Sequence, residues 1–133
     1  LAGNAGLFST ARDVARVYQM LLNGGEIDGQ RYLSKETCQL FTTETSKISR
    51  RGLGFDKPDA DDSKKGNCAP AAPAEVYGHT GFTGTCAWVD PVNELVYVFL
   101  SNRIYPDVTN RKLNQLHIRE RIQGAIYDAM KKK

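Results

Sequence analysis

The apolar positions near the start of the chain follow a helical repeat. They are spaced so that one face of a helix over residues 9–23 would be buried: Val14, Val17, Tyr18, Leu21 and Leu22. Ser9 or Thr10 can cap the first turn, and Asp13 occupies the capping-box position with Asp in place of Glu. The sequence Asn23-Gly24-Gly25 predicts that a left-handed cap ends this helix.

Two more helices are expected further along the chain. Asp28-Gly29 predicts a turn within a short hairpin at residues 26–33, and a helix over residues 34–43 follows, with a serine as its cap. A second apolar stripe predicts a long helix over residues 109–130. This stripe consists of Leu113, Leu116, Ile122, Ile126 and Met130.

Short runs of β-branched and aromatic residues lie between the second helix and the last one. The strands expected from them cover residues 52–55, 75–79, 85–90 and 94–102. The sequence Asp90-Pro91-Val92-Asn93 predicts a turn between two of these strands. The nearly continuous apolar run from Leu95 to Leu100 favours a central strand buried on both faces. Residues 56–74 are expected to form an irregular surface loop.

The order of these elements predicts an α+β fold. In such a fold an antiparallel sheet of three or more strands is packed by the N- and C-terminal helices. The length of 133 residues fits one domain, and no apolar run approaches the 20 or so residues that a membrane span requires. No secretory signal is expected at residues 1–8, because they contain neither a basic segment nor a long apolar one.

The net charge of +3 is too small to indicate a nucleic-acid-binding protein. Residues 111–133 carry seven basic and two acidic side chains, a net charge of +5, so residues 1–110 sum to −2. The basic end is typical of a solvated helix face with a basic tail, and a patch for an anionic partner is the alternative.

The three cysteines, Cys38, Cys68 and Cys86, are too few and too scattered to predict a disulfide scaffold. One bridge plus a free thiol stays open. Cys38 and Cys86 lie inside periodic apolar segments, which favours buried reduced thiols for these two.

The densest group of residues with chemical potential is the segment Gly78-His79-Thr80-Gly81-Phe82-Thr83-Gly84-Thr85. Its glycines allow a ligand to approach the backbone closely, His79 is of the one side-chain type that ordinarily exchanges a proton near neutral pH, and N–H groups beside Gly81 can bind an anion. The alternative is a glycine-rich turn in which His79 bonds to the backbone. Both interpretations stay open on the residues alone.

Other kinds of site are not supported. His79 and His117 are far apart, neither has a second ligand at metal-binding spacing, and His117 is expected on the polar flank of the last helix. The segment that contains Asp59, Asp61 and Asp62 has neither the glycine nor the terminal glutamate that a calcium-binding loop needs after such aspartates. Arg103 can reach an anion, although a surface ion pair is the commoner fate of such a residue.

The motifs of the chain, taken together and in order, resemble a known family. They are Ala5–Ala15 (AGLFSTARDVA), Asn23-Gly24-Gly25, Gly52–Phe55 (GLGF), Gly78–Thr85 (GHTGFTGT), Trp88–Pro91 (WVDP) and Phe99–Arg103 (FLSNR). Over nearly its whole length the chain resembles the C-terminal half of serine β-lactamase-like hydrolases. This family includes class C β-lactamases, penicillin-binding DD-peptidases and related esterases, and the likeness is to forms typical of Bacteroidetes-type bacteria.

The resemblance implies roles for four residues. In this family a Ser-x-x-Lys motif, a Tyr-x-Asn-type motif and a Lys/His-Thr-Gly strand meet in one cleft. His79-Thr80-Gly81 would be the third motif, with His79 where lysine usually stands, and Thr80 would hydrogen-bond the substrate or orient the catalytic network. Phe82 would donate its backbone N–H to the oxyanion hole. No cofactor is implied.

The first two motifs are absent from the sequence. No serine is followed three residues later by lysine, and only Tyr32-Leu33-Ser34 approaches the tyrosine motif. A covalent mechanism needs an activated nucleophile, so we expect the C-terminal portion of a longer serine hydrolase that is inactive alone. Its expected partners are the missing N-terminal half and a small acyl substrate (a β-lactam, peptide or ester), in the periplasm or cell envelope.

Two other interpretations stay open. In the first, the chain is a non-catalytic module that binds cell-wall or glycan ligands. In the second, it is a structural module appended to a family 3 glycosidase. An incomplete family fold would also leave one sheet edge and one apolar face without partners, which favours self-association.

Overall fold

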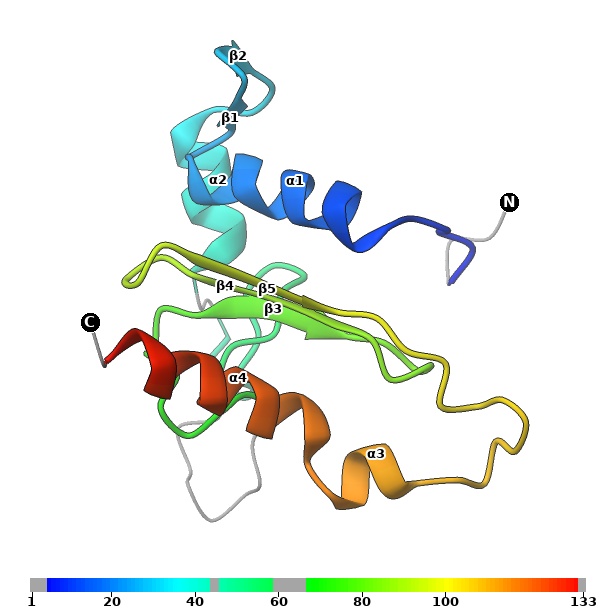
Figure 1. The fold of residues 1–133 in the computed structure, drawn as a ribbon. Helices are drawn as coiled ribbons and strands as arrows, with labels where there is room; N and C mark the ends of the chain where they lie inside the picture. Colours follow the sequence, from blue (N-terminus) through cyan, green and yellow to red (C-terminus); the bar gives the residue numbers. More distant parts are fainter. Residues whose placement is uncertain (1–4, 44–45, 59–66, 132–133) are drawn as a thin grey trace.

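The computed structural model describes residues 5–43, 46–58 and 67–131, and shows helices on both faces of a small sheet (Figure 1). The elements in chain order are α1 (Ala11–Leu22), β1 (Glu26–Ile27), β2 (Gln30–Arg31), α2 (Lys35–Thr42), β3 (Tyr77–Thr80), β4 (Cys86–Asp90), β5 (Leu95–Phe99), α3 (Lys112–Gln115) and α4 (Ile118–Met130). Helix α1 packs against β4 and β5, and α4 covers the opposite face. The α+β fold class expected from the sequence is confirmed.

The main sheet is antiparallel and has the order β3-β4-β5. Residue Trp88 of β4 faces Gly78 on one side and Tyr97 on the other. All five residues of β4 are buried, whereas Tyr97 is the only buried residue of β5. The expectation of a doubly buried central strand at Leu95–Leu100 is therefore wrong. Two successive hairpin connections place the middle strand of the chain, β4, in the middle of the sheet.

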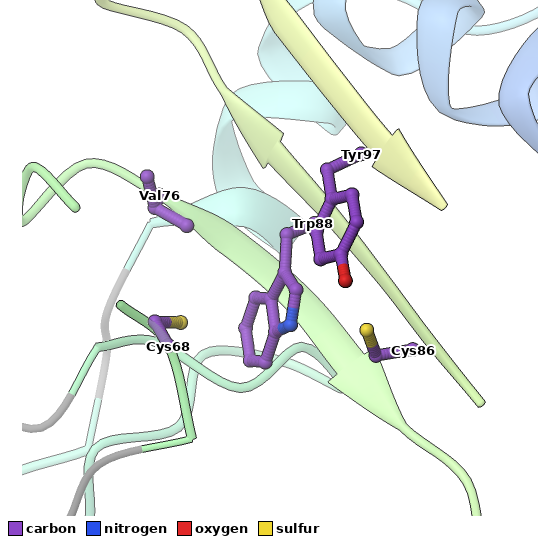
Figure 2. Close-up of a cluster of buried hydrophobic side chains, with 5 residues drawn as sticks. All are labelled: Cys68, Val76, Cys86, Trp88 and Tyr97. Carbon is purple, nitrogen blue, oxygen red and sulfur yellow. The ribbon is translucent and has the colours of Figure 1, made fainter. Parts of the chain in front are cut away.

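The core lies between this sheet and α4. It is formed by Cys68, Val76, Cys86, Trp88 and Tyr97. The Trp88 indole is at the centre, with Val76 and Cys68 on one side and Tyr97 and Cys86 on the other (Figure 2). All three cysteines are buried free thiols, as expected for Cys38 and Cys86. Burial raises the pKa of the Cys86 thiol to about 11, so it is protonated at neutral pH.

The ends of the first two helices follow the local chemistry of the sequence. The Thr10 side chain accepts a hydrogen bond from the Asp13 N–H at 3.2 Å and donates one to its carboxylate at 2.8 Å. Gly24 and Gly25 have φ values of 67° and 95°, and their N–H groups close the C-terminal cap of α1. Ser34 accepts from the Thr37 N–H at 3.1 Å at the start of α2. Both capping predictions are confirmed.

The expectation of one long helix over residues 109–130 is wrong, because the chain forms two helices there. His117 has a left-handed backbone (φ 49°, ψ 43°) and separates α3 from α4. Its N–H donates to Asn114 O in α3, and its carbonyl accepts from Arg121 N in α4. His117 therefore caps a helix instead of lying on a helical flank. The first helical residue is Lys112, and the Asn110 side chain accepts a hydrogen bond from its N–H at 3.1 Å.

The strand expected at residues 52–55 is also absent. Gly54 has φ 123°, and the Gly52 N–H donates to Phe55 O, so the segment forms a tight reversal. Only Asp56, directly after the reversal, pairs with β3, at Gly78. The part of the 56–74 loop at residues 59–66 lies outside the described residues, as do Asp59, Asp61 and Asp62. Within the described ranges, no helix combines the length and apolar character needed to cross a membrane.

Candidate active-site strand

The glycine-rich motif forms the end of β3 and the hairpin that leads into β4. The Gly81 N–H donates to Thr85 O at 2.8 Å, and the Gly84 N–H donates to Gly81 O at 2.9 Å. Gly84 has φ 95°. These features describe a type I turn followed by a one-residue bulge, in which the third loop residue needs the left-handed conformation that glycine adopts cheaply. Phe82 and Thr83 therefore occupy the hairpin tip.

The outer edge of β3, which faces away from β4, is hydrogen-bonded at Gly78 and has an unpaired N–H at Thr80 among the described residues. The Gly78 N–H and C=O bond to Asp56 at 3.0 and 2.8 Å, so they face away from β4. Peptide groups alternate in direction along a strand, and Thr80 therefore presents its N–H and C=O to the same outer edge. Among the described residues, the Thr80 N–H has no partner. The carbonyl of an extended ligand can accept a hydrogen bond from this N–H, whereas the Thr80 carbonyl already accepts one from His79 Nδ1.

The Phe82 N–H is a second unpaired donor next to this edge. Its peptide unit includes the Gly81 carbonyl, which is held by the Gly84 N–H inside the turn. A trans peptide is planar and its N–H points opposite to its C=O, so the Phe82 N–H points out of the turn. Within the described part of the chain it has no acceptor. The arrangement is that of a fixed donor available to an external anion.

His79 lies on the face of β3 that carries Tyr77. Tyr77 packs edge-on against Phe55, which packs in turn against Tyr18 of α1. The His79 side chain is exposed, and its Nδ1 lies 2.6 Å from Thr80 O, which makes Nδ1–H the donor and leaves Nε2 unprotonated in the neutral ring. Such a backbone bond also fits the alternative of a structural glycine-rich turn.

Gly78 and Gly84 are both needed for close packing around the motif. A Cβ at Gly78 would lie 2.7 Å from a Trp88 ring carbon and 2.1 Å from Ala87 O. A Cβ at Gly84 would lie 2.6 Å from Ser101 Oγ. Neither space accepts a side chain, so these two glycines fix where the strand and its hairpin lie. Gly81 is hindered by the Thr85 side chain alone.

The hairpin tip contacts the segment that follows β5. The Arg103 N–H and the Ser101 hydroxyl both donate to Thr83 O, at 2.9 and 3.0 Å. The Arg103 guanidinium lies over the Phe82 ring, 4.8 Å from its centroid. No carboxylate pairs with Arg103 in the described ranges, so the surface ion pair expected as its commoner fate is not observed.

The residue whose backbone pairs with Gly78 of β3, Asp56, carries a buried carboxylate that the sequence did not mark as a candidate. Asp56 is 2% exposed, and Arg51 Nε lies 2.8 Å from its Oδ1 in an ion pair. Arg50 lies 3.5 Å from Oδ2. These ion pairs lie within the segment of residues 50–56, and the backbone of Asp56 links this segment to the strand. Across the described residues there is no group of three or more side chains suited to a metal ion.

The motif residues His79 to Phe82 lie outside the cavity formed by the described part of the chain. A cavity of about 530 Å³ lies between the end of α1, α2 and the start of β3, and its lining includes Cys38, Lys57 and Tyr77. The Lys57 ammonium there donates to the carbonyls of Thr42 and Glu75. None of the residues from His79 to Phe82 lines it. The motif therefore occupies an open strand edge, which needs further groups to become a cleft.

One known family matches most of the chain. The family described as "Beta-lactamase" matches residues 1–120. The chain belongs to the beta-lactamase family. The resemblance to serine β-lactamase-like and penicillin-binding-protein-like hydrolases, inferred from the motifs, is confirmed. The antiparallel sheet with helices on both faces is consistent with the fold of that family.

Several similar single proteins share one name. A protein named "Putative D-alanyl-D-alanine carboxypeptidase" from Escherichia coli O157:H7 is 36% identical over 114 residues, covering 86% of this chain and 26% of the relative. Proteins of the same name from Escherichia coli strain K12 and Salmonella typhi are 35% and 36% identical over the same coverage. The chain thus spans about a quarter (26%) of the length of the curated relatives it matches.

Proposed function

We propose that this beta-lactamase-family chain is the C-terminal portion of a serine hydrolase that cleaves small acyl substrates through an acyl-serine intermediate. The observation that carries the proposal is the open outer edge of β3, where the Thr80 N–H and the Phe82 N–H have no partner among the described residues. The names of the relatives favour a peptide ending in D-alanyl-D-alanine as substrate.

Each residue of the motif has a role in the proposed reaction. Thr80 pairs through its backbone with an amide of the substrate, and Gly81 keeps the strand free of a bulky side chain at that point. The Phe82 N–H donates to the oxyanion that develops as the serine attacks the carbonyl carbon. One such donor is worth about 3–4 kcal/mol in the transition state. His79 faces the cleft with Nε2 as an acceptor, where lysine stands in other members.

The nucleophile and its base come from outside this sequence. No Ser-x-x-Lys motif is present, so the chain alone performs no acylation. The proposed partner of the chain is the N-terminal half of the same protein, which supplies the serine and lysine and forms the other wall of the cleft. This requirement fits the open strand edge, because an edge without a facing wall does not exclude water.

The Phe82 position allows a direct test of the proposal in the full-length protein. Phe82 is the second residue of a type I turn, where proline is favoured, so Phe82→Pro removes the N–H donor and keeps the turn. Phe82→Ala removes the ring and keeps the donor, and it serves as the matched control. We expect acylation by a fluorescent penicillin to slow about 10²–10³-fold in Phe82→Pro and to slow clearly less in Phe82→Ala, which keeps the donor and loses only the ring that Arg103 covers.

Two results would overturn the proposal. One is a full-length wild-type protein that neither reacts with the fluorescent penicillin nor releases D-alanine from a D-alanyl-D-alanine peptide. The other is equal acylation of Phe82→Pro and Phe82→Ala. The absence of Ser-x-x-Lys from this chain favours one alternative, a non-catalytic module that binds cell-wall peptides. That alternative predicts retention on peptidoglycan without any acylation.

A further inference from the structure

The segment Ser101-Asn102-Arg103, directly after β5, holds the hairpin tip from outside. Two donors from this segment, the Ser101 hydroxyl and the Arg103 N–H, converge on the single carbonyl of Thr83. The guanidinium of Arg103 covers the ring of Phe82. This segment therefore fixes both residues of the tip: Thr83 through its carbonyl and Phe82 through its ring.

The contact between the two segments is also tight in van der Waals terms. An ideal Cβ at Gly84 would lie 2.6 Å from Ser101 Oγ, 3.4 Å from Arg103 Cγ and 3.2 Å from Leu113 Cδ1 of α3. These atoms pack directly on the glycine backbone. Neither segment can move toward the other, and the two hydrogen bonds to Thr83 oppose separation. The hairpin tip is therefore restrained in both directions.

Hairpin tips are ordinarily among the more mobile parts of a fold, because few contacts restrain them. A hydrogen-bond donor that acts in catalysis must be held within about 0.5 Å of its productive position. The Phe82 N–H belongs to the peptide between Gly81 and Phe82, at the start of this tip. The hydrogen bond from the Gly84 N–H to Gly81 O fixes the plane of that peptide only relative to the turn. Contacts from outside the hairpin are needed to fix the turn relative to the sheet.

We propose that Ser101 and Arg103 are positioning residues, which hold the hairpin so that the Phe82 N–H stays directed at the reacting carbonyl. This inference rests on the proposed function of Phe82 as an oxyanion donor. It assigns the Arg103 cation to the protein's own Phe82 ring and not to a substrate anion. Ser101 and Arg103 do not touch the reacting atoms.

The test uses the full-length protein and the rate of acylation by a fluorescent penicillin. Ser101→Ala removes one of the two donors to Thr83, and Arg103→Ala removes the cover of the Phe82 ring. We expect the double variant to lower kcat about 10- to 100-fold, the scale on which misplacement of a catalytic group acts, with KM little changed. Arg121→Ala removes an equal charge from the exposed face of α4 and should leave the rate unchanged.

Conservative variants separate positioning from general loss of structure. Ser101→Thr keeps the hydroxyl and should restore most of the rate, and thermal unfolding identifies any variant that is not folded. The decisive readout is a double-mutant cycle with Phe82→Pro. Once the donor is gone, Ser101→Ala should have little further effect on kcat, whereas a purely structural role predicts that the two losses multiply.

The outcomes distinguish this inference from the proposed function. Loss of acylation in Phe82→Pro combined with wild-type rates in the Ser101 and Arg103 variants would overturn the positioning role alone. Multiplying losses in the cycle would do the same. Equal acylation of Phe82→Pro and Phe82→Ala would overturn the proposed oxyanion donor, and the positioning role with it.

Discussion

Cys86 and Tyr97 are neighbouring acids that the core keeps protonated. Burial is the main cause in both, raising the pKa of Cys86 to about 11 and the pKa of Tyr97 above its usual value. Burial likewise raises the pKa of the Cys68 thiol. A thiol that stays protonated is a poor nucleophile and a poor partner for disulfide exchange. The core thiols of this chain are therefore packing groups.

These raised pKa values predict a loss of stability at alkaline pH. The unfolded thiol ionises near 9.0, whereas the folded Cys86 thiol ionises near 11, so the folded state holds more protons in this range. The contribution is fully present below about pH 9 and is lost as the pH rises through 11. We expect Tm to fall between pH 9 and pH 11, and to fall less steeply in Cys86→Ala. A Tm that is constant over this range contradicts the prediction.

At the scale of elements, the capping residues could be predicted from the sequence and the helix break could not. Thr10 with Asp13, and Ser34 with Thr37, act over three residues, so their chemistry is local. The break at His117 has no glycine or proline to announce it. The apolar stripe continues across it in the sequence. The way α3 and α4 pack separately decides the break, and that packing is tertiary.

The left-handed backbone at His117 predicts opposite effects for two substitutions. A β-branched residue is disfavoured in this conformation by about 1–2 kcal/mol, whereas glycine adopts it readily. We expect His117→Val to lower the free energy of unfolding by that amount, and His117→Gly to leave it unchanged or raise it slightly. Urea denaturation followed by circular dichroism measures both. Equal destabilisation by Val and Gly would show that the His117 side chain matters more than its backbone.

For the candidate site too, the contiguous residues could be predicted from the sequence, whereas the contacts between distant segments could not. The motif from His79 to Phe82 could be found from the sequence, because its residues are contiguous. The contacts of Ser101 and Arg103 with Thr83 join positions about 20 residues apart, through the order of the strands. The one signal in the sequence is that both segments lie inside motifs that carry the family resemblance. Which strand is central was likewise decided by hairpin connectivity, and not by the apolar content of Leu95–Leu100.

At the scale of the whole molecule, large apolar side chains remain on the surface. Leu7 and Phe8 are 85% and 95% exposed, and Ile48 is 99% exposed. Helix α1 is amphipathic, yet none of its residues is buried. A chain of this size ordinarily buries more of its apolar helix faces. These surfaces fit a protein in which further segments cover them.

We therefore predict that the isolated chain self-associates. Light scattering over a range of protein concentrations should show a mass above 14.7 kDa that increases with concentration. Replacing Leu7 and Phe8 by serine removes exposed apolar area and should lower the association. A monodisperse monomer at all concentrations contradicts the prediction.

The placement of Trp88 gives the molecule a built-in optical reporter. It is the one tryptophan in the sequence, it is 1% exposed, and it packs directly over the Gly78 backbone on the strand that precedes the hairpin. Its emission thus originates from a single buried position next to the candidate site. Any event that loosens the core or shifts β3, including the docking of another segment along its open edge, changes the surroundings of that one fluorophore.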